Sequence, residues 1–494
     1  MATKDSKMSR RPGFELKTPK GTRDWVGSDL AWREDILFSS LTYKSQTISS
    51  VFKRHGGTPL DTPVFELKEV LAEKYGEDAH LVYDLADQGG EICSLRFDLT
   101  VPFARWLAMK KITHVKRYQI AKVYRRDQPA ISRGRLREFH QCDFDIAGLY
   151  DPMIADAEIL SIIAEVFEAL DLKITIKINH RQILDGLFAV AGVPDEKMRS
   201  ISSALDKMDK MSWSEVKREM VQEKGLLEEV ADRIGDYVRR SGDIYEVLQF
   251  LESNPGFSAN ENMKAGLHDM RLLVSYLEAL DVVNKVSFDL SLARGLDYYS
   301  GLIFEIITKP PSGNVAVVSG EGIQSSEQRK PEPSQVGSIA AGGRYDSLVG
   351  MYGKRPIPCV GVSFGVDRIC TVLEERREKA QKPKIDVYIM AFSGKDSNGF
   401  LLERMMVARQ LWDAGIRAEF AAKVKPNLPQ QFKAAKDLPL AVIFGQDELS
   451  AGQVRLKVLL PDNDENDTKD RGQLVSREDL VEEVKKLLKI TISN

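Results

Sequence analysis

The sequence predicts an α+β fold built on an antiparallel sheet flanked by helices, with a helical insertion and a small C-terminal α/β domain. Strand-like runs at 115–124 and 139–146 flank an arginine-rich loop, which is typical of a long antiparallel hairpin. Residues from about 180 to 280 follow a charged, helical pattern. Beyond Pro383, strand-like and helix-like runs alternate, which favours an α/β domain.

The length of 494 residues suits about three domains at roughly 150 residues each. We expect a disordered tail over 1–17, a large domain over 18–382 that carries the insertion at about 180–280, and the α/β domain over 383–494. The formal net charge of -3 gives no overall sign of nucleic-acid binding, so any basic surface must be local.

Shorter patterns predict the remaining elements of the large domain. A helix over about Trp32–Arg54 is ended by Gly56 and Gly57. Alternating side chains predict a strand over 92–98. The other expected elements are a helix over about 151–170 and strands over 298–308 and 359–364.

Several classes of protein are disfavoured by the composition. Because the cysteines are far apart and form no C-x-x-C pair, we expect buried free thiols. The six histidines lack metal-ligand spacing, and no run approaches the ~18 apolar residues of a membrane span. The N-terminus has no apolar signal core, so we expect a cytoplasmic protein without a membrane partner, and its mildly basic character leaves a mitochondrial form open. The four cysteines are Cys93, Cys142, Cys359 and Cys370.

The loop at 125–137 (RRDQPAISRGRLR) holds five arginines. Pro129 and Gly134 disfavour a regular helix, and an arginine-rich loop can wrap a polyanion through bidentate phosphate contacts. A solvated surface loop is the alternative. Arg125 and Asp127 lie at its start.

Polar residues on the strands around this loop are candidates for ligand binding. Gln141 and Asp145 share one face of the second strand, with Asp143 between them, and could bind an amine or an imidazole. The alternative is the solvated side of a half-buried strand. Asp98 and Thr100 end an earlier strand, where a carboxylate could hold an ammonium group or only cap a turn or helix.

Three later segments combine arginine with glycine. Residues 293–301 (ARGLDYYSG) carry Arg294 and two tyrosines, which face opposite ways in a strand and could also be a core pair. Residues 340–346 (AAGGRYD) pair glycines beside an arginine, which permits close approach to a ligand or an ordinary turn. Residues 359–370 (CVGVSFGVDRIC) predict a strand, Gly365, and a helix whose first turn carries Arg368, a place that suits phosphate. The sequence has neither a P-loop nor a G-x-G-x-x-G motif, so an ATP site would be of another kind.

Taken together, these segments resemble the class II aminoacyl-tRNA synthetases and, among them, the histidyl-tRNA synthetase family of the eukaryotic type. The resemblance runs from about Pro19 to Lys489 and rests on all three class motifs and two histidine-specific segments in order. The motifs are TPVFELK, VYRRDQP with GRLREFHQCDFDIAG, and GVSFGVDR; the segments are ARGLDYYSG and AAGGRYD; TPKGTRDW near the start also matches.

The resemblance implies a role for each candidate residue. Arg125 would clamp the α-phosphate of ATP and Arg368 the γ-phosphate, while Asp127 replaces an adenine-contacting glutamate. Arg294 would approach the substrate carboxylate and the α-phosphate. The amino-acid pocket would comprise Asp98, Leu99 and Thr100 at the α-amino group, Gln141 and Asp145 along its wall, and Tyr298 and Tyr299 beside the imidazole.

The implied activity is activation of L-histidine by ATP to histidyl-adenylate and transfer to tRNA(His). ATP is a substrate, and Mg²⁺ would be bound mainly through it rather than by a protein metal site. A class II synthetase fold, a homodimer and an anticodon-binding C-terminal domain are also implied. The alternatives are a catalytically inactive paralogue that acts as a regulatory or tRNA-sensing module, and a class II enzyme for another amino acid.

Overall fold

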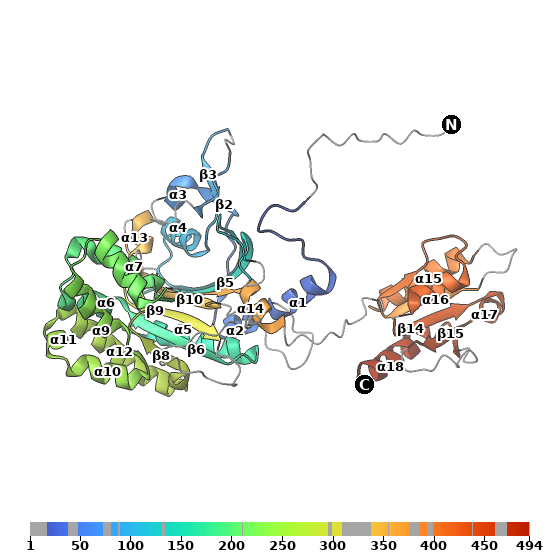
Figure 1. The fold of residues 1–494 in the computed structure, drawn as a ribbon. Coiled ribbons are helices and arrows are strands. Elements are labelled where there is room, and N and C mark those ends of the chain that lie inside the picture. The colour runs from blue at the N-terminus through green and yellow to red at the C-terminus, as the bar shows by residue number, and fades with distance from the viewer. Residues whose placement is uncertain are drawn as a thin grey trace, which may run out of the picture. The chain divides into compact units, whose positions relative to one another are not determined.

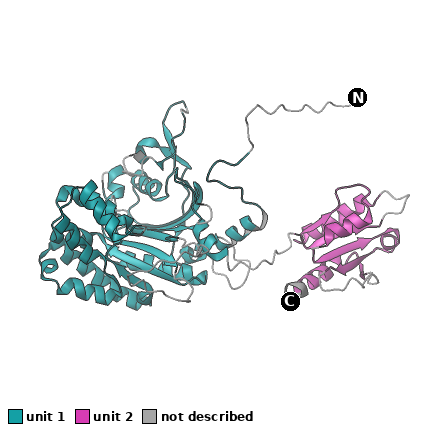
Figure 2. Ribbon diagram, in the orientation of Figure 1, with its two compact units in different colours: residues 1–377 teal, residues 378–494 magenta. Residues whose placement is uncertain are grey.

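The computed structural model divides the chain into two compact units, Met1–Arg377 and Glu378–Asn494 (Figure 2). Within the predicted tail over 1–17, only Lys17 is described, and Tyr298 lies outside the described residues. In the ranges that the structure describes, no helix has both the length and the apolar character needed to cross a membrane. The structure describes all residues except 1–16, 38–47, 73–80, 87–88, 131–133, 210, 295–298, 309–336, 354, 375–384, 393–398, 437, 460–471 and 494.

A nine-stranded sheet forms the centre of the first unit, in the order β1-β4-β5-β11-β10-β9-β6-β8-β7. The strands from β4 to β6 pair antiparallel, as predicted, whereas β1 joins β4 and β8 joins β6 in parallel. The sheet is therefore antiparallel in its middle and mixed overall. Its strands are β1 (Thr58–Pro59), β4 (Val115–Tyr124), β5 (Glu138–Ala147), β6 (Ile174–His180), β7 (Ser241–Gly242), β8 (Val286–Asp289), β9 (Leu302–Thr308), β10 (Ala340–Arg344) and β11 (Cys359–Gly365).

The two faces of this sheet differ in chemistry because side chains alternate along each strand. One face is apolar: Phe144, Phe304 and Phe364 lie in a large buried cluster with residues of α5 (Ile154–Ala169) and α2 (Ile48–Arg54). The other face carries polar side chains, many of them buried. These are Arg117, Gln119, Gln141, Asp143, Asp145, Glu305 and Ser363.

The helix expected over about Trp32–Arg54 is described in part. Residues 27–37 and 48–54 are helical, and residues 38–47 lie outside the described residues. The second stretch ends at Arg54, two residues before Gly56, whose φ is +76°. A separate two-stranded antiparallel sheet is formed by β2 (Phe65–Leu67) and β3 (Cys93–Leu95). The other helices are α1 (Gly27–Leu37), α3 (Lys68–Ala72), α4 (Thr100–Lys110), α13 (Leu348–Tyr352) and α14 (Val366–Glu374).

The chain between β6 and β8 forms the helical insertion that the sequence predicts. Figure 1 shows its helices gathered at one end of the unit, beside β6 and β8. Their apolar side chains join the main buried cluster, so the insertion packs onto the sheet domain. Its elements are α6 (Arg181–Ala191), α7 (Met198–Leu205), α8 (Trp213–Arg218), α9 (Glu228–Val238), α10 (Ile244–Ser253), α11 (Pro255–Ala259) and α12 (Glu261–Ala279), with short turns η3 (Asp195–Lys197), η4 (Asp206–Asp209), η5 (Glu219–Glu223) and η6 (Val283–Lys285).

The second unit is an α/β domain with its own core. Its five-stranded sheet has the order β13-β12-β14-β15-β16; β12 pairs in parallel with β13 and β14, and the other pairings are antiparallel. The central strands β12 and β14 are buried along their whole length, as expected for strands covered on both faces. Its elements are β12 (Val387–Ala391), α15 (Leu401–Asp413), β13 (Ala418–Phe420), α16 (Leu428–Ala435), β14 (Leu440–Phe444), α17 (Gln446–Ser450), β15 (Gln453–Val458), β16 (Gln473–Ser476) and α18 (Leu480–Ser493).

Candidate active site

A buried acidic cluster occupies the polar face of the main sheet. Asp145 on β5 lies opposite Arg117 on β4, and Arg117 Nη2 is 2.7 Å from Asp145 Oδ2 and 4.0 Å from Asp143 Oδ2. The Tyr345 hydroxyl donates a hydrogen bond to Asp145 Oδ1. Burial raises the pKa of Asp143 to about 7, the Arg117 charge opposes this shift, and the Asp145 charge adds to it. Burial also raises the pKa of Asp145, against the charge of Arg117.

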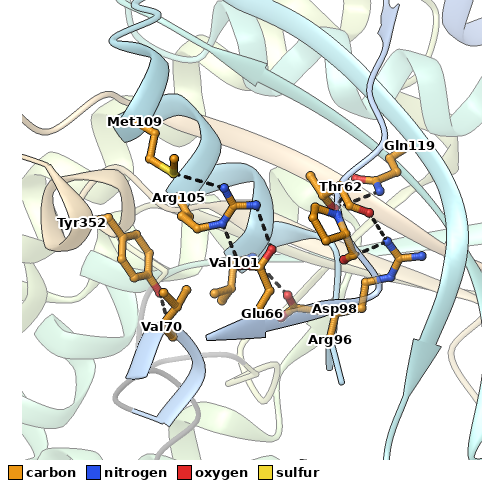
Figure 3. Close-up of polar contacts among 11 residues, drawn as sticks. Thr62, Glu66, Val70, Arg96, Asp98, Val101, Arg105, Met109, Gln119 and Tyr352 are labelled. Atoms are coloured by element: carbon orange, nitrogen blue, oxygen red, sulfur yellow. Dashed lines mark hydrogen bonds and ion pairs between the residues drawn. The ribbon is translucent and has the colours of Figure 1, made fainter. Parts of the chain in front are cut away.

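The segment Asp98–Thr100 meets this cluster at the start of α4. Asp98 Oδ1 accepts a hydrogen bond from the backbone N–H group of Val101 at 3.0 Å (Figure 3) and another from that of Thr100 at 3.1 Å. Asp98 therefore caps the start of α4, which was one of the two roles that the sequence allowed. Its charge also raises the pKa of Asp143 and Asp145, which shows that the three carboxylates share one environment. Capping and ligand binding are compatible here, because a carboxylate has several acceptor positions.

Buried arginine contacts hold this segment in place. Arg96 donates to the carbonyl of Thr62 at 2.7 Å, which ties the chain before Asp98 to the loop before β2 (Figure 3). It also donates to the carbonyl of Lys122 at 2.7 Å, which ties the same chain segment to β4. Arg117 Nη2 donates to the carbonyl of Leu99 at 3.0 Å. The predicted residues Asp98, Leu99, Thr100 and Asp145 are therefore brought together by packing between α4, β4 and β5.

Gln141 stands further along the same face of β5, opposite Gly365 at the end of β11. Its side chain is buried, and within the described residues its Oε1 has no hydrogen-bond donor. A buried amide oxygen without a partner costs stability and is a natural acceptor for a bound N–H group. Arg368 follows Gly365 by three residues, so Gln141 lies between the acidic cluster and the arginines.

Arginines distant in the sequence converge at the other end of the polar face. Arg368 Nη1 donates to the Ser338 carbonyl at 2.6 Å, and Arg294 Nη1 donates to the Ser338 hydroxyl at 2.8 Å and lies 3.0 Å from Glu305 Oε1. Burial lowers the pKa of Arg368, and the charges of Arg135, Arg294 and Arg125 lower it further. The guanidinium groups of these three arginines therefore lie near enough to that of Arg368 to repel it, an arrangement that a polyphosphate would stabilise.

Arg125 is fixed beside the acidic segment. Its Nε donates to the Phe97 carbonyl at 3.1 Å, and its guanidinium lies 4.3 Å from the ring centroid of Phe97 and 5.2 Å from that of Phe139. Both rings hold the planar cation in place without neutralising it. Arg125 thereby lies between the segment that carries Asp98 and the group around Arg368.

Asp127 is engaged with other residues of the arginine-rich loop. Its Oδ2 accepts hydrogen bonds from Arg135 at 2.5 Å and 2.8 Å, and its carbonyl accepts one from Arg137 at 2.8 Å. The contact of Asp127 with adenine stays a prediction. In this structure its carboxylate instead holds Arg135 within the arginine group.

The glycine-rich segment AAGGRYD contributes a strand, Ala340–Arg344, and not the ordinary turn that the sequence left open. It forms β10 between β9 and β11, and a Cβ on Gly342 would lie 2.1 Å from the Gly361 carbonyl. A Cβ on Gly343 would lie 2.9 Å from the ring of Tyr299, so this glycine makes room for an aromatic ring. Tyr299 is half-buried there. Tyr298 lies outside the described residues, so its position beside the imidazole stays a prediction.

Sequence reasoning passed over three residues of the acidic cluster. The strand pattern places Asp143 only between two candidate residues, and Arg117 and Tyr345 are not among the residues that the sequence predicts. Alternation in β4 was an available signal, because Arg117 and Gln119 share one face of the strand with the apolar residues Val115, Ala121 and Val123. In the described part of the chain, no group of three or more His, Cys, Asp or Glu side chains is arranged to hold a metal ion.

Comparisons with known proteins agree along almost the whole chain. A family model described as histidyl-tRNA synthetase matches residues 40–320, more than half of the chain, and a model described as an anticodon binding domain matches residues 386–487. The mitochondrial histidine–tRNA ligase of Saccharomyces cerevisiae is 51% identical over 94% of this chain and 86% of its own length. The histidine–tRNA ligase of Danio rerio is 49% identical over 96% of this chain and 89% of its own length.

Solved structures show the same fold. The histidyl-tRNA synthetase from Nostoc sp. PCC 7120 superimposes with a TM-score of 0.69 at 27% identity and covers 96% of this chain and 99% of its own. A protein described as an ATP phosphoribosyltransferase regulatory subunit/histidyl-tRNA synthetase from Bacillus halodurans has a TM-score of 0.62 at 19% identity over 87% and 98%, a likeness of fold alone. The predicted α+β fold with its C-terminal α/β domain is confirmed, and the chain belongs to the histidyl-tRNA synthetase family.

Proposed function

We propose that this protein activates L-histidine with ATP to form histidyl-adenylate and then transfers the histidyl group to the 3′ end of tRNA(His). The observation that carries the proposal is one sheet face with a buried acidic cluster at one end and four converging arginines at the other. The first end suits the ammonium group of an amino acid, and the second suits a triphosphate. The two ends together match the two substrates of amino-acid activation.

The arginines stabilise charge in the first step. The histidine carboxylate attacks the α-phosphorus of ATP, the bond to the β-phosphate oxygen breaks, and pyrophosphate leaves. Arg125 and Arg294 act on the α-phosphate, and Arg368 acts on the γ-phosphate. Because these side chains are already anchored to the Phe97 carbonyl and to Ser338, little reorganisation is needed as charge moves to the phosphate oxygens.

The acidic end selects the amino acid. Asp98 and Thr100 bind the α-ammonium group, and Gln141 and Asp145 pair with the imidazole nitrogens. A buried polar pocket of this kind rejects analogues that leave its groups unpaired, by up to about 10⁴–10⁵-fold. Tyr298 and Tyr299 close the pocket around the ring.

Mg²⁺ and tRNA complete the reaction. Mg²⁺ enters with ATP and is held mainly by phosphate oxygens, the hard ligands that it prefers. The second unit, which is similar to the anticodon-binding model, binds the tRNA anticodon, and the insertion contacts the acceptor stem. The enzyme acts as a homodimer, which gel filtration with light scattering tests directly: a mass near twice the 55.5 kDa of the chain is expected.

The direct test of the function is ATP–pyrophosphate exchange with each of the twenty amino acids in turn, followed by charging of tRNA transcripts. We expect exchange with histidine and charging of tRNA(His). Exchange with another amino acid would support a different class II specificity. Absence of exchange, together with retained tRNA binding, would support the inactive, tRNA-sensing paralogue and contradict the proposal.

We also propose that the protein works in the cytoplasm. Its relatives include the cytoplasmic histidine–tRNA ligase of Dictyostelium discoideum, 45% identical over 92% of this chain and 89% of its own length, as well as mitochondrial forms. A C-terminal fluorescent fusion should fill the cytosol. Concentration of the signal in mitochondria would contradict this assignment.

A further inference from the structure

One buried guanidinium joins the two walls of the acidic cluster. Arg117 is 1% exposed, and the same nitrogen, Nη2, lies 2.7 Å from Asp145 Oδ2 and donates to the Leu99 carbonyl at 3.0 Å. Its guanidinium stacks 4.4 Å from the ring centroid of Phe103 on α4. Arg117 therefore connects β5, which carries the wall with Asp145, to the segment that carries Asp98.

The second oxygen of the same carboxylate is held from another strand. The Tyr345 hydroxyl, buried just after β10, donates to Asp145 Oδ1. Gly361 on β11 leaves the space that this oxygen occupies, since a Cβ there would lie 1.9 Å from it. With one oxygen near Arg117 and the other bonded to Tyr345, Asp145 is confined to a single orientation.

Arg117 is poorly suited to a purely stabilising role. Its Nε and Nη1 are buried, and within the described residues neither has a hydrogen-bond acceptor. Burying a cation with unsatisfied donors is expensive, and an apolar side chain of similar volume often stabilises such a position equally well. Its charge has a use in the site, because it lies near the carboxylates of Asp145 and Asp143 and lowers the pKa of both, which favours the ionised forms that a cationic ligand needs.

We propose that Arg117 and Tyr345 are positioning residues for histidine recognition. They hold Asp145 and the segment around Leu99 in fixed positions relative to one another. Neither residue needs to touch the substrate; both act through Asp145, and Arg117 acts also through Leu99. The inference deepens the proposed function and rests on it.

A double-mutant cycle tests whether Tyr345 acts through Asp145. Histidine and ATP KM values in pyrophosphate exchange are measured for wild type, Tyr345→Phe, Asp145→Asn and the double variant. Loss of a hydrogen bond to a buried charge predicts a rise in histidine KM of about 10-fold for Tyr345→Phe, with the ATP KM unchanged within about twofold. In the Asp145→Asn background, the same change should raise histidine KM by less than about twofold. Equal effects on both substrates, or additive effects in the double variant, would overturn the proposal.

Arg117 is tested by a graded pair of substitutions with a matched control. Arg117→Lys keeps the charge and Arg117→Met removes it, so histidine KM should rise in the order wild type, Lys, Met. The control is Arg404→Met, because Arg404 is also fully buried but lies in the second unit and donates to backbone carbonyls. Its melting temperature should fall while both KM values stay at wild-type level. If Arg117→Met does not fold, Arg117→Lys and the Tyr345 cycle decide the outcome.

The outcomes separate failure of the inference from failure of the function. No histidine-dependent exchange by wild type would remove the proposed function and the inference with it. Normal exchange by wild type, with a raised histidine KM for Asp145→Asn but Tyr345 and Arg117 variants that behave like Arg404→Met, would remove the inference alone.

Discussion

The two ends of the polar sheet face differ in how their charges are held. At the acidic end, Asp143 and Asp145 are about 2% exposed, and their neighbours Arg117 and Tyr345 are side chains. At the basic end, Arg125 and Arg368 are half-buried and are anchored through neutral backbone carbonyls, while Arg294 and Arg135 pair with the carboxylates of Glu305 and Asp127. Side-chain partners fix geometry and partly neutralise a charge, whereas carbonyl anchors leave the charges of Arg125 and Arg368 available. Under the proposed function, the acidic end discriminates shape, and these two arginines stabilise developing charge.

Arg125→Ala should give the largest effect, because it removes a charge from the end that we propose stabilises the transition state. We expect pyrophosphate exchange to fall about 100- to 1000-fold, with little change in melting temperature. A suitable control is Arg409→Ala, which removes an exposed arginine paired with Asp413 on α15. Normal exchange by the Arg125 variant would place this residue outside the active site.

Gly361→Ala tests how closely the acidic end is packed. Its new Cβ would fall 1.9 Å from Asp145 Oδ1, so the carboxylate must move. Displacement of a substrate-positioning group by about 1 Å can cost about 100-fold, and we expect a loss of that order in kcat/KM for histidine. Gly350→Ala, where the nearest atom would be at 3.4 Å, should leave exchange unchanged. An unaltered histidine kcat/KM in the Gly361 variant would show that Asp145 does not line the pocket.

Gln141→Ala should distinguish the effects of the two ends on substrate binding, because Gln141 lies between the acidic end and the basic end. Loss of one hydrogen bond to the imidazole predicts a rise in histidine KM of about 10-fold and a much smaller change in ATP KM. Initial-rate exchange at varied histidine and varied ATP measures both. Equal changes in the two KM values would mean that Gln141 serves both substrates and that the pocket assignment is wrong.

The charge cluster of His55, Glu158 and Glu165 should affect the stability of the protein but not its activity. Hydrogen bonding to Glu158 raises the pKa of His55, burial opposes this, and Glu165 adds to the rise. Burial raises the pKa of both glutamates, but hydrogen bonds from His55, Lys116 and Arg54 outweigh it and the net shift is downward.

The directions of these pKa shifts define the pH range in which the cluster stabilises the folded protein, the smallest of the expected effects. The contribution of His55 is fully present below its unfolded pKa of 6.5 and is lost as pH rises through the raised folded value. The glutamates contribute above 4.5 and lose that contribution as pH falls through their lowered values. The free energy of unfolding of wild type should therefore exceed that of His55→Gln by about 1 kcal/mol or less, and the resulting difference in melting temperature should be largest between about pH 4.5 and 6.5. A difference that grows above pH 7, or a shifted pH profile of exchange, would contradict this.

Local pattern was enough to predict the centre of the fold. The hairpin expected from runs at 115–124 and 139–146 is observed as β4 and β5, paired along their whole length. Because side chains alternate in a strand, the placement of Gln141 and Asp145 on one face followed directly. The glycine pair of AAGGRYD was harder to interpret, because close packing against neighbouring strands and a tight turn both favour glycine.

Short motifs and periods of two and 3.6 residues were enough to identify the family, the sheet-based fold and the residue types at the site. The contacts among these residues depend on how the chain folds: Arg117 meets the Asp145 carboxylate and the Leu99 carbonyl, and Arg294 and Arg368 both bond to Ser338. Those contacts join segments that are between 18 and 44 residues apart in the sequence. Their geometry comes from the packing of strands and helices around a shared core, and no local pattern encodes it.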